Sequence, residues 1–362
     1  MSSPSPATAR PVFIVGSPRS GTSIFTWCLG QHPNLLGLEE SNWMTTFAVD
    51  LAAAFRRGSS RGERSQFSSM GMQRDQFMAE IGDRIDCSIS NHRAVFAERR
   101  AKQAAQGAAA AAHAAFKIAR APTDPKERWV NGTPEYSLGI ANLRKLFPRA
   151  RFIHLVRDCD SVVRSLMNFE RAIGIRLIET AEEGYRRWAA CVKACLAAES
   201  AYGPTVVRRL THQELKENPA EFMRQALEFL GESFDEVCLE PLNKKINSSG
   251  DEATVPKEWL ESEAAREARS LWQQIKEHPQ TEATDSALAT QLDEEFEARV
   301  TYICELNERL SQTQQEYRRL EDRMNERTQW ALRLKDEVEQ QKKIISQLQE
   351  KLERGRNFFG LK

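Results

Sequence analysis

The sequence predicts an α/β fold in which a parallel sheet is flanked by helices and followed by a long C-terminal coiled-coil helix. Two observations carry this prediction. Short apolar runs of four to six residues alternate with longer segments of helical periodicity, which is typical of a parallel sheet covered on both faces. From Ala283 to Arg354, apolar residues recur at helical spacing and neither Pro nor Gly interrupts the segment.

The expected strands are short and apolar, and a turn or a helix start bounds each of them. They lie at 11–16, 35–38, 128–131, 151–156 and 205–209. Helical patterns fill the intervals, and the pattern near 220–230 has Pro219 at its start and Gly231 just past its end, as helices prefer. Residues 44–116 are expected to form a mainly helical insertion that includes an alanine-rich stretch at 101–115.

Charge divides the chain into unlike parts although the whole is neutral. The 362 residues include 51 Lys and Arg and 51 Asp and Glu, yet residues 1–250 carry a net charge of +6 and residues 251–362 one of −6. The expected segments are a disordered N-terminus at 1–10, an α/β domain at 11–250, a linker with helices at 251–282 and a coiled coil at 283–354.

Composition excludes several classes of protein. No run of 18 apolar residues occurs, so no membrane span is expected, and the first ten residues lack the apolar core of a secretory signal. The mild basic excess of the first part suits a small anionic ligand, and it is too small for a nucleic-acid track. The seven cysteines show no metal-ligand spacing and are expected to be reduced thiols, which predicts a cytoplasmic protein.

The turn after the first expected strand has the pattern of a phosphate-binding loop. The eight residues from Gly16 to Ser23 are GSPRSGTS, which is G-x-x-x-x-G-T-S. Small residues allow successive backbone N–H groups and the start of the next helix to point at one anion. A nucleoside triphosphatase has Lys where Thr22 stands, whereas the cation here is Arg19. The loop therefore predicts a sheet of the P-loop type that binds an anion shorter than a triphosphate.

The loop and its flanks carry a family resemblance. The string VFIVGSPRSGTS, followed by His-Pro and a Glu pair, resembles the start of sulfotransferases that use 3′-phosphoadenosine-5′-phosphosulfate (PAPS). It is particularly similar to the glycan and tyrosylprotein branch, where Arg replaces the Lys of the cytosolic enzymes. That family holds the 3′-phosphate with an Arg at a strand end and a Ser eight residues later, and Arg157 and Ser165 match. The resemblance covers about 12–232. The cofactor-binding residues that it implies are Arg19, Ser20, Gly21, Thr22, Ser23, Arg157 and Ser165.

The resemblance also implies how the reaction is catalysed. Arg19 and the loop N–H groups are expected to stabilise charge during sulfuryl transfer, and no metal is required. The expected base is a Glu just past the second strand, with Glu40 the closer match and Glu39 the alternative. Two departures stand out. Asn131-Gly132 precede Thr133-Pro134 where the family often has Lys or Glu-Lys, and Asp-Cys-Asp at 158–160 replaces the commoner Asp-Pro-Arg.

The C-terminal segment shows a coiled-coil pattern over seven heptads. Alternate steps of three and four residues from Ile303 to Leu352 visit fifteen positions, of which twelve are apolar. A helix from Ala289 to Leu352 would be roughly 95 Å long, too long to fold onto a domain of this size. We therefore expect a homo-oligomer, or a partner protein bound through the coiled coil, with a lone charged helix as the alternative.

Three functions remain open at this level. The leading one is a PAPS-dependent sulfotransferase acting on an acceptor hydroxyl, for which a glycan is one candidate, and no nucleic-acid partner is expected. The second is a P-loop kinase or NTPase, against which the absent loop Lys counts. The third is a scaffold whose inactive sulfotransferase domain only presents the coiled coil, although Arg19, Ser165 and the Glu pair are all present. The acceptor pocket is expected to involve 44–116 and 247–250.

Overall fold

The computed structural model describes residues 8–105, 124–169, 176–243 and 257–358. The chain divides into two compact units, Met1–Thr301 and Tyr302–Lys362. Parts of the expected segments lie outside the described residues. These are 1–7 of the N-terminus, 106–123, 170–175 and 244–250 of the α/β domain, which include the end of the helical insertion, and 251–256 of the linker.

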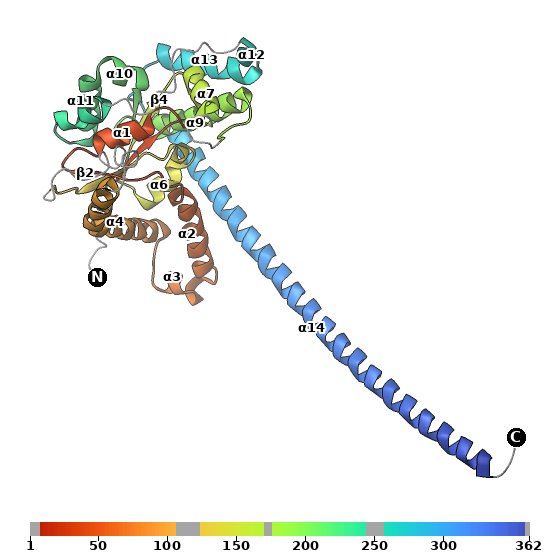
Figure 1. Cartoon of the computed structure of the whole chain (residues 1–362). Coiled ribbons are helices and arrows are strands. Elements are labelled where there is room, and N and C mark those ends of the chain that lie inside the picture. Colours follow the sequence, from red (N-terminus) through yellow and green to blue (C-terminus); the bar gives the residue numbers. More distant parts are fainter. Residues whose placement is uncertain (1–7, 106–123, 170–175, 244–256, 359–362) are drawn as a thin grey trace. The chain divides into compact units, whose positions relative to one another are not determined.

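The first unit contains the parallel sheet that the sequence predicts, with five strands among the described residues (Figure 1). The strands are β1 (Val12–Val15), β2 (Leu35–Gly37), β3 (Arg128–Asn131), β4 (Arg151–Val156) and β5 (Val207–Thr211). Their order is β2-β3-β1-β4-β5, and every neighbouring pair is parallel. β1 and β4 lie next to each other with Val15 opposite His154, so the segments that follow these two strands emerge side by side.

Helices follow the strands in chain order and cover both faces of the sheet. In the described part of the first unit, the α-helices that precede α14 are α1 (Thr22–Leu29), α2 (Met44–Ser59), α3 (Gln66–Ser69), α4 (Arg74–Ala105), α6 (Ile140–Leu146), α7 (Cys159–Met167), α9 (Ala181–Tyr202), α10 (His212–Glu217), α11 (Pro219–Leu230), α12 (Lys257–Leu260) and α13 (Glu263–Glu277). Short 3-10 helices are η1 (Gly62–Arg64), η2 (Pro134–Gly139) and η3 (Glu236–Asn243). The insertion is thus largely helical over its described part.

Successive side chains of β1 point to opposite faces of the sheet, and both faces are covered by other parts of the chain. Ile14 faces the core beneath α1 and α11, where the rings of Phe25 and Phe222 meet edge to face at 5.0 Å. Phe13 faces the other side and stacks on Phe152 of β4 at 5.3 Å, with Trp129 of β3 edge-on at 5.5 Å. This double burial explains why β1 is apolar at every position.

The long helix α14 (Ser286–Phe358) begins inside the first unit. Phe296 and Val300 are buried, and Glu297 pairs with Arg56 at 2.9 Å and with Arg74 at 2.6 Å. The first unit therefore runs on to Thr301, past the position 283 at which the coiled coil is expected to begin. None of the helices in the described ranges has the length and apolarity needed to cross a membrane. All seven cysteines are free thiols.

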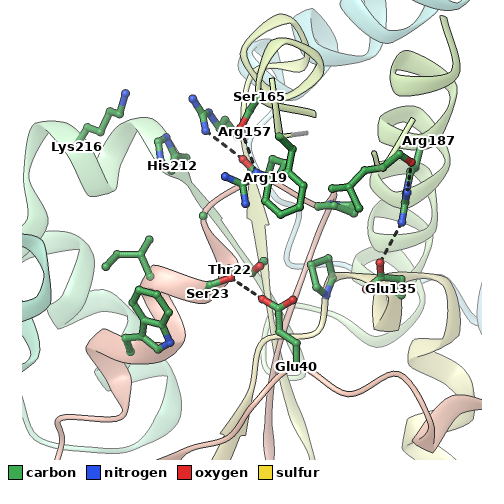
Figure 2. A pocket seen from close by; sticks show the side chains of 17 residues that line it. Arg19, Thr22, Ser23, Glu40, Glu135, Arg157, Ser165, Arg187, His212 and Lys216 are labelled. Carbon is green, nitrogen blue, oxygen red and sulfur yellow. Dashed lines mark hydrogen bonds and ion pairs between the residues drawn. The ribbon is translucent and has the colours of Figure 1, made fainter. Parts of the chain in front are cut away.

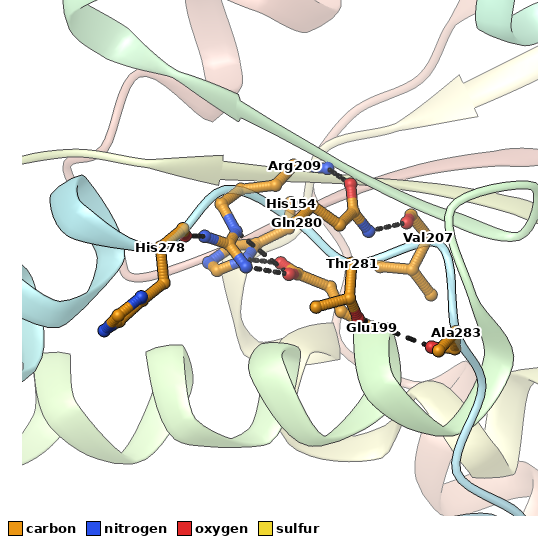
Figure 3. Close-up of polar contacts among 8 residues, drawn as sticks. All are labelled: His154, Glu199, Val207, Arg209, His278, Gln280, Thr281 and Ala283. Atoms are coloured by element: carbon orange, nitrogen blue, oxygen red, sulfur yellow. Dashed lines mark hydrogen bonds and ion pairs between the residues drawn. The ribbon is translucent and has the colours of Figure 1, made fainter.

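A buried polar network lies between β4, β5 and α9 (Figure 3). Glu199 of α9 accepts hydrogen bonds from Arg209 Nε at 2.9 Å and Nη2 at 2.7 Å, and it also bonds His154 Nδ1. Burial by itself raises the pKa of the Glu199 carboxyl, but His154 and Arg209 outweigh burial and hold the pKa below its usual value. The side chain of Gln280 continues the network along β5, where it accepts from Arg209 N at 3.0 Å and donates to Val207 O at 2.6 Å.

We expect Glu199→Gln to lower the free energy of unfolding at pH 7 by about 3 to 5 kcal/mol, because it leaves the largely buried guanidinium of Arg209 without its counter-charge. The lowered pKa fixes the pH dependence. The carboxylate stabilises the fold fully above its usual pKa of 4.5, and this contribution is lost as the pH falls through the lower folded value. Urea unfolding of both proteins should therefore show a difference that shrinks below about pH 4.5. The exposed pair Glu182–Arg186 supplies the control, since Glu182→Gln should change stability little at any pH.

Candidate active site

The loop between β1 and α1 curls tightly against its neighbours. Gly16 has a φ of +150°, and a Cβ there would lie 2.4 Å from the carbonyl oxygen of Leu155 on β4. Gly21 has a φ of +98°, and its Cβ would lie 2.8 Å from the ring of His212. Arg19 occupies the left-handed region with a φ of 70°, which is uncommon for a residue with a side chain and is often associated with ligand sites. Close approach of β4 and α10 therefore requires glycine at both ends of the loop.

The first turn of α1 is prepared to receive an anion. Its N-cap residue Gly21 offers no side-chain cap, so the first N–H groups of the helix and the positive end of its dipole are not satisfied by a cap side chain. Ser20 is fully buried, and its Oγ has no hydrogen-bond partner among the described residues. Because a buried hydroxyl without a partner is costly, this group indicates a missing acceptor at the loop. A phosphate or similar anion fits these donors.

The residues expected to bind the 3′-phosphate meet the loop directly (Figure 2). Arg19 Nε donates to Ser165 Oγ of α7 at 3.1 Å, and Arg157 Nη1 donates to the Arg19 carbonyl oxygen at 3.1 Å. Trp188 of α9 anchors Arg157 by donating from Nε1 to its carbonyl oxygen at 2.9 Å, and the Phe169 ring lies 4.5 Å from the Arg19 guanidinium. The structure thus brings Arg19, Arg157 and Ser165 together at the loop.

The electrostatics of this corner favour an anionic ligand. Burial and then the charge of Arg157 lower the pKa of Arg19, while the charge of Glu40 opposes the change. Two guanidinium groups held this close repel each other, and an anion between them would relieve that repulsion.

Glu39 and Glu40 differ in their position relative to the loop. Ser23 in the first turn of α1 donates its hydroxyl to Glu40 Oε1 at 2.5 Å, and Glu40 lines the cavity beside the loop. Glu39 is not among the residues that line that cavity, and its carbonyl oxygen accepts from Asn131 Nδ2 at 3.1 Å. Glu40 is therefore the member of the pair that reaches the phosphate-binding loop, and it is exposed at the mouth of the site.

A cavity of about 350 Å³ joins these parts. Four charged or titratable residues on its wall carry no local motif, and sequence reasoning missed them: Glu135, Arg187, His212 and Lys216. His212 and Lys216 lie one turn apart on α10, near Arg157 (Figure 2). On the opposite side of the cavity, Arg187 Nη2 donates to Glu135 Oε1 at 3.0 Å. The sequence signal that could have grouped His212 with Lys216 is their spacing, because positions four apart share a helix face.

The unusual Asp-Cys-Asp segment has its own partners. Asp158 caps α7 by accepting from the backbone N–H of Asp160 at 3.0 Å. The Asp160 carboxylate accepts from Tyr185 Oη at 2.7 Å and from Arg269 of α13 through Nε at 3.1 Å and Nη2 at 2.6 Å. Burial raises the pKa of Asp160, but the bonds from Arg269 and Tyr185 outweigh it and lower the pKa overall. Arg269 of α13 thus contacts the first turn of α7, the helix that carries Ser165.

The described residues contain no group of three or more His, Cys, Asp or Glu side chains that could hold a metal ion. The functional groups that line the cavity are backbone donors, guanidinium and ammonium groups, hydroxyls, the imidazole of His212 and the carboxylates of Glu40 and Glu135.

Comparison with solved structures gives three examples of distant similarity. The sulfotransferase domain of the Synechococcus PCC 7002 olefin synthase is 17% identical with a TM-score of 0.39, covering 80% of this chain and 96% of that one. Sulfotransferase STF9 from Mycobacterium avium is 16% identical with a TM-score of 0.42, covering 78% and 79%. Retinol dehydratase in complex with androsterone and the inactive cofactor PAP is 14% identical with a TM-score of 0.29, covering 81% and 82%.

No curated protein sequence matches the chain. The family model described as "Sulfotransferase family" matches residues 11–236, which include every strand of the sheet and all the site residues that the sequence predicts. The chain therefore belongs to the sulfotransferase family.

Proposed function

We propose that the chain transfers the sulfuryl group of PAPS to an acceptor hydroxyl, with Glu40 as the general base. The single observation that carries this proposal is that the segment from the loop to the start of α1 contacts both an expected phosphate-binding residue and the expected base. Arg19 is bonded to Ser165 on one side of the loop, and Ser23 is bonded to Glu40 on the other. A ligand that spans the loop would therefore present its nucleotide to the first pair and its transferable group to the second.

The donor set fits such a co-substrate. The uncapped start of α1 and the partnerless hydroxyl of Ser20 suit the 5′-phosphate, and the close Arg157, Arg19 and Ser165 suit a second phosphate. Arg is well adapted to this task because its planar fork can bind two phosphate oxygens at once. When bound, PAPS supplies the sulfuryl group and a bisphosphate leaving group.

Catalysis by the chain's own residues then has two parts. Arg19 and the N–H groups at 20–23 stabilise the negative charge that develops on the departing phosphate, and they are already fixed in place before the reaction. Glu40 takes the proton of the acceptor hydroxyl as that oxygen forms its bond to sulfur and the bond from sulfur to the phosphate oxygen breaks. Ser23 fixes the Glu40 carboxylate beside the loop, so the base and the anion site keep a constant separation.

We infer a glycan as the acceptor class. The cavity wall opposite α10 carries the Glu135–Arg187 pair, which offers both acceptors and donors to a ligand with several hydroxyl groups. Trp27 of α1 and Leu177 add apolar surface to the same cavity, and such surface suits the C–H face of a sugar ring. Arg19, which stands where the cytosolic sulfotransferases have Lys, agrees with the glycan and tyrosylprotein branch of the family.

The cofactor class is tested by 3′-phosphoadenosine-5′-phosphate, the spent cofactor, against Mg-ATP. We expect the spent cofactor at about 100 times its dissociation constant to add about 2.7 kcal/mol, or on the order of 5–10 °C in melting temperature. Ser165→Ala should weaken its affinity by about tenfold, because one hydrogen bond to a charged phosphate is lost. The affinity for adenosine 5′-phosphate, which lacks the 3′ group, should stay within twofold and serves as the control. A shift with Mg-ATP alone would instead indicate a kinase.

The partnerless hydroxyl of Ser20 gives a second prediction. We expect Ser20→Ala to leave the unfolding free energy of the unliganded protein unchanged or slightly higher, because the buried hydroxyl has no bond to lose. The same variant should bind 3′-phosphoadenosine-5′-phosphate about tenfold more weakly by calorimetry. Ser137→Ala is the matched control, since Ser137 is also buried but lies on η2 and not on the loop between β1 and α1. Equal affinities for the Ser20 and Ser137 variants would place the anion elsewhere.

The role of Glu40 is tested by separating binding from transfer. We expect Glu40→Gln to bind 3′-phosphoadenosine-5′-phosphate within about twofold of the wild type while losing about 10²- to 10⁴-fold in transfer rate, the usual contribution of a general base. Transfer is followed with labelled PAPS and a panel of hydroxyl acceptors that includes oligosaccharides and a tyrosyl peptide. Glu39→Gln is the matched control and should keep most of the activity. Loss of activity in Glu39→Gln alone would assign the base to the other member of the pair.

A further inference from the structure

The second unit, which begins at Tyr302, exposes an apolar stripe along α14. The side chains on this stripe recur at alternate steps of three and four residues, so they share one face of the helix. They are exposed by between 43% and 67%: Leu306, Leu310, Tyr317, Leu320, Met324, Leu334, Val338, Ile345, Leu348 and Leu352. An apolar stripe of this length is not typical of monomeric surfaces, and it indicates a helical partner.

Three polar residues interrupt the stripe and constrain the partner. With Ile303 at position a of the heptad, Thr313, Arg327 and Gln341 all fall at position d. In a parallel pair in register, every layer brings a residue against its own copy. The guanidinium of Arg327 would then face a second guanidinium inside the interface, where like charges are poorly screened. A parallel homodimer is therefore disfavoured at its centre.

An antiparallel pair removes this conflict. If residues whose numbers sum to 658 lie opposite each other, Arg327 faces the short side chain of Ala331 in the second copy, which leaves space for the guanidinium to reach the edge. In the same register, Leu306 faces Leu352 and Leu310 faces Leu348, so the stripe is covered from end to end. Sliding the register by one heptad to a sum of 665 places Gly355 opposite Leu310 and moves Arg327 from the small Ala331 to the larger Val338.

The charges beside the stripe agree with the antiparallel register. The heptad positions e and g lie on either side of the apolar stripe. In an antiparallel pair, an e position lies beside an e position of the second copy, and a g position beside a g position. This brings Glu321 beside Lys335 and Arg323 beside Glu337 of the second copy. Each contact occurs twice, and Arg309 beside Lys351 is the opposing repulsive contact. In the parallel pair, Glu337 attracts Lys342, but Glu316 repels Glu321. The antiparallel arrangement thus has more attractive contacts as well as the better central layer.

We propose that the second unit binds a second copy of itself as an antiparallel coiled coil, with Arg327 opposite Ala331. The two helices start at opposite ends of the pair, and the overlap from Leu306 to Leu352 is about 70 Å at 1.5 Å per residue. This inference depends on the pattern of unit two alone and is independent of the proposed sulfuryl transfer.

The first test reverses one charge, because the two orientations predict opposite signs. In the full chain at low salt, Glu321→Lys places Lys beside Lys335 in the antiparallel pair, so we expect the dimer dissociation constant to rise about tenfold in sedimentation equilibrium. The double variant Glu321→Lys with Lys335→Glu should return to within twofold of the wild type. In a parallel pair Glu321→Lys would tighten the dimer by relieving the repulsion with Glu316. Glu326→Lys, on the outer face of the helix, is the matched control and should have no effect beyond twofold.

The second test reads the orientation directly. Leu310→Cys and Leu348→Cys are made separately in the full chain with Cys87→Ser and Cys304→Ser, which removes the cysteines that are not buried. In the antiparallel register a short thiol cross-linker should join the two variants when they are mixed, and neither variant should cross-link to itself. Self-cross-linking of either variant would establish the parallel pair and overturn the proposal. A monomer at all concentrations, or a dimer that forms only with another protein, would overturn it as well.

Discussion

The close contact between Gly16 and the carbonyl oxygen of Leu155 sets the geometry on which the site depends. Because no side chain fits between them, the loop after β1 can lie directly on the end of β4. Arg19 then reaches Ser165 on the helix that follows β4, and Arg157 reaches back to the Arg19 carbonyl group. Side chains far apart in the sequence are thus brought to one point by the parallel pairing of two neighbouring strands.

Much of this could be predicted from the sequence because the signals are local. Strands β3 and β4 have the bounds that their apolar runs indicate, and the glycine-containing loop lies between strand and helix as expected. The roles of Arg157 and Ser165 came from the family resemblance, and the structure brings both to the loop. Of the Glu pair, only Glu40 lines the cavity, a distinction that the adjacent positions of the two residues could not give with certainty.

The missed features depend on tertiary packing. Nothing near Arg187 in the chain marks it as a cavity residue, because the tertiary packing of α9 brings it there. The first unit also extends past position 283, at which the coiled coil is expected to begin. Phe296 continues the same heptad register as Ile303, yet it is buried within the first unit. Periodicity shows that a helix face is apolar and does not show what covers it.

The bonds between Gln280 and β5 have a consequence for how the protein is made. Strand β5 is at the edge of the sheet, and the amide of Gln280 occupies the backbone groups of Val207 and Arg209 that an incoming strand would use. Gln280 lies well beyond residue 236, where the match to the family ends. During synthesis, the outer edge of β5 is therefore uncovered until the segment that contains Gln280 has left the ribosome. The strands of the sheet are thus made before the residue that protects their edge from pairing with another chain.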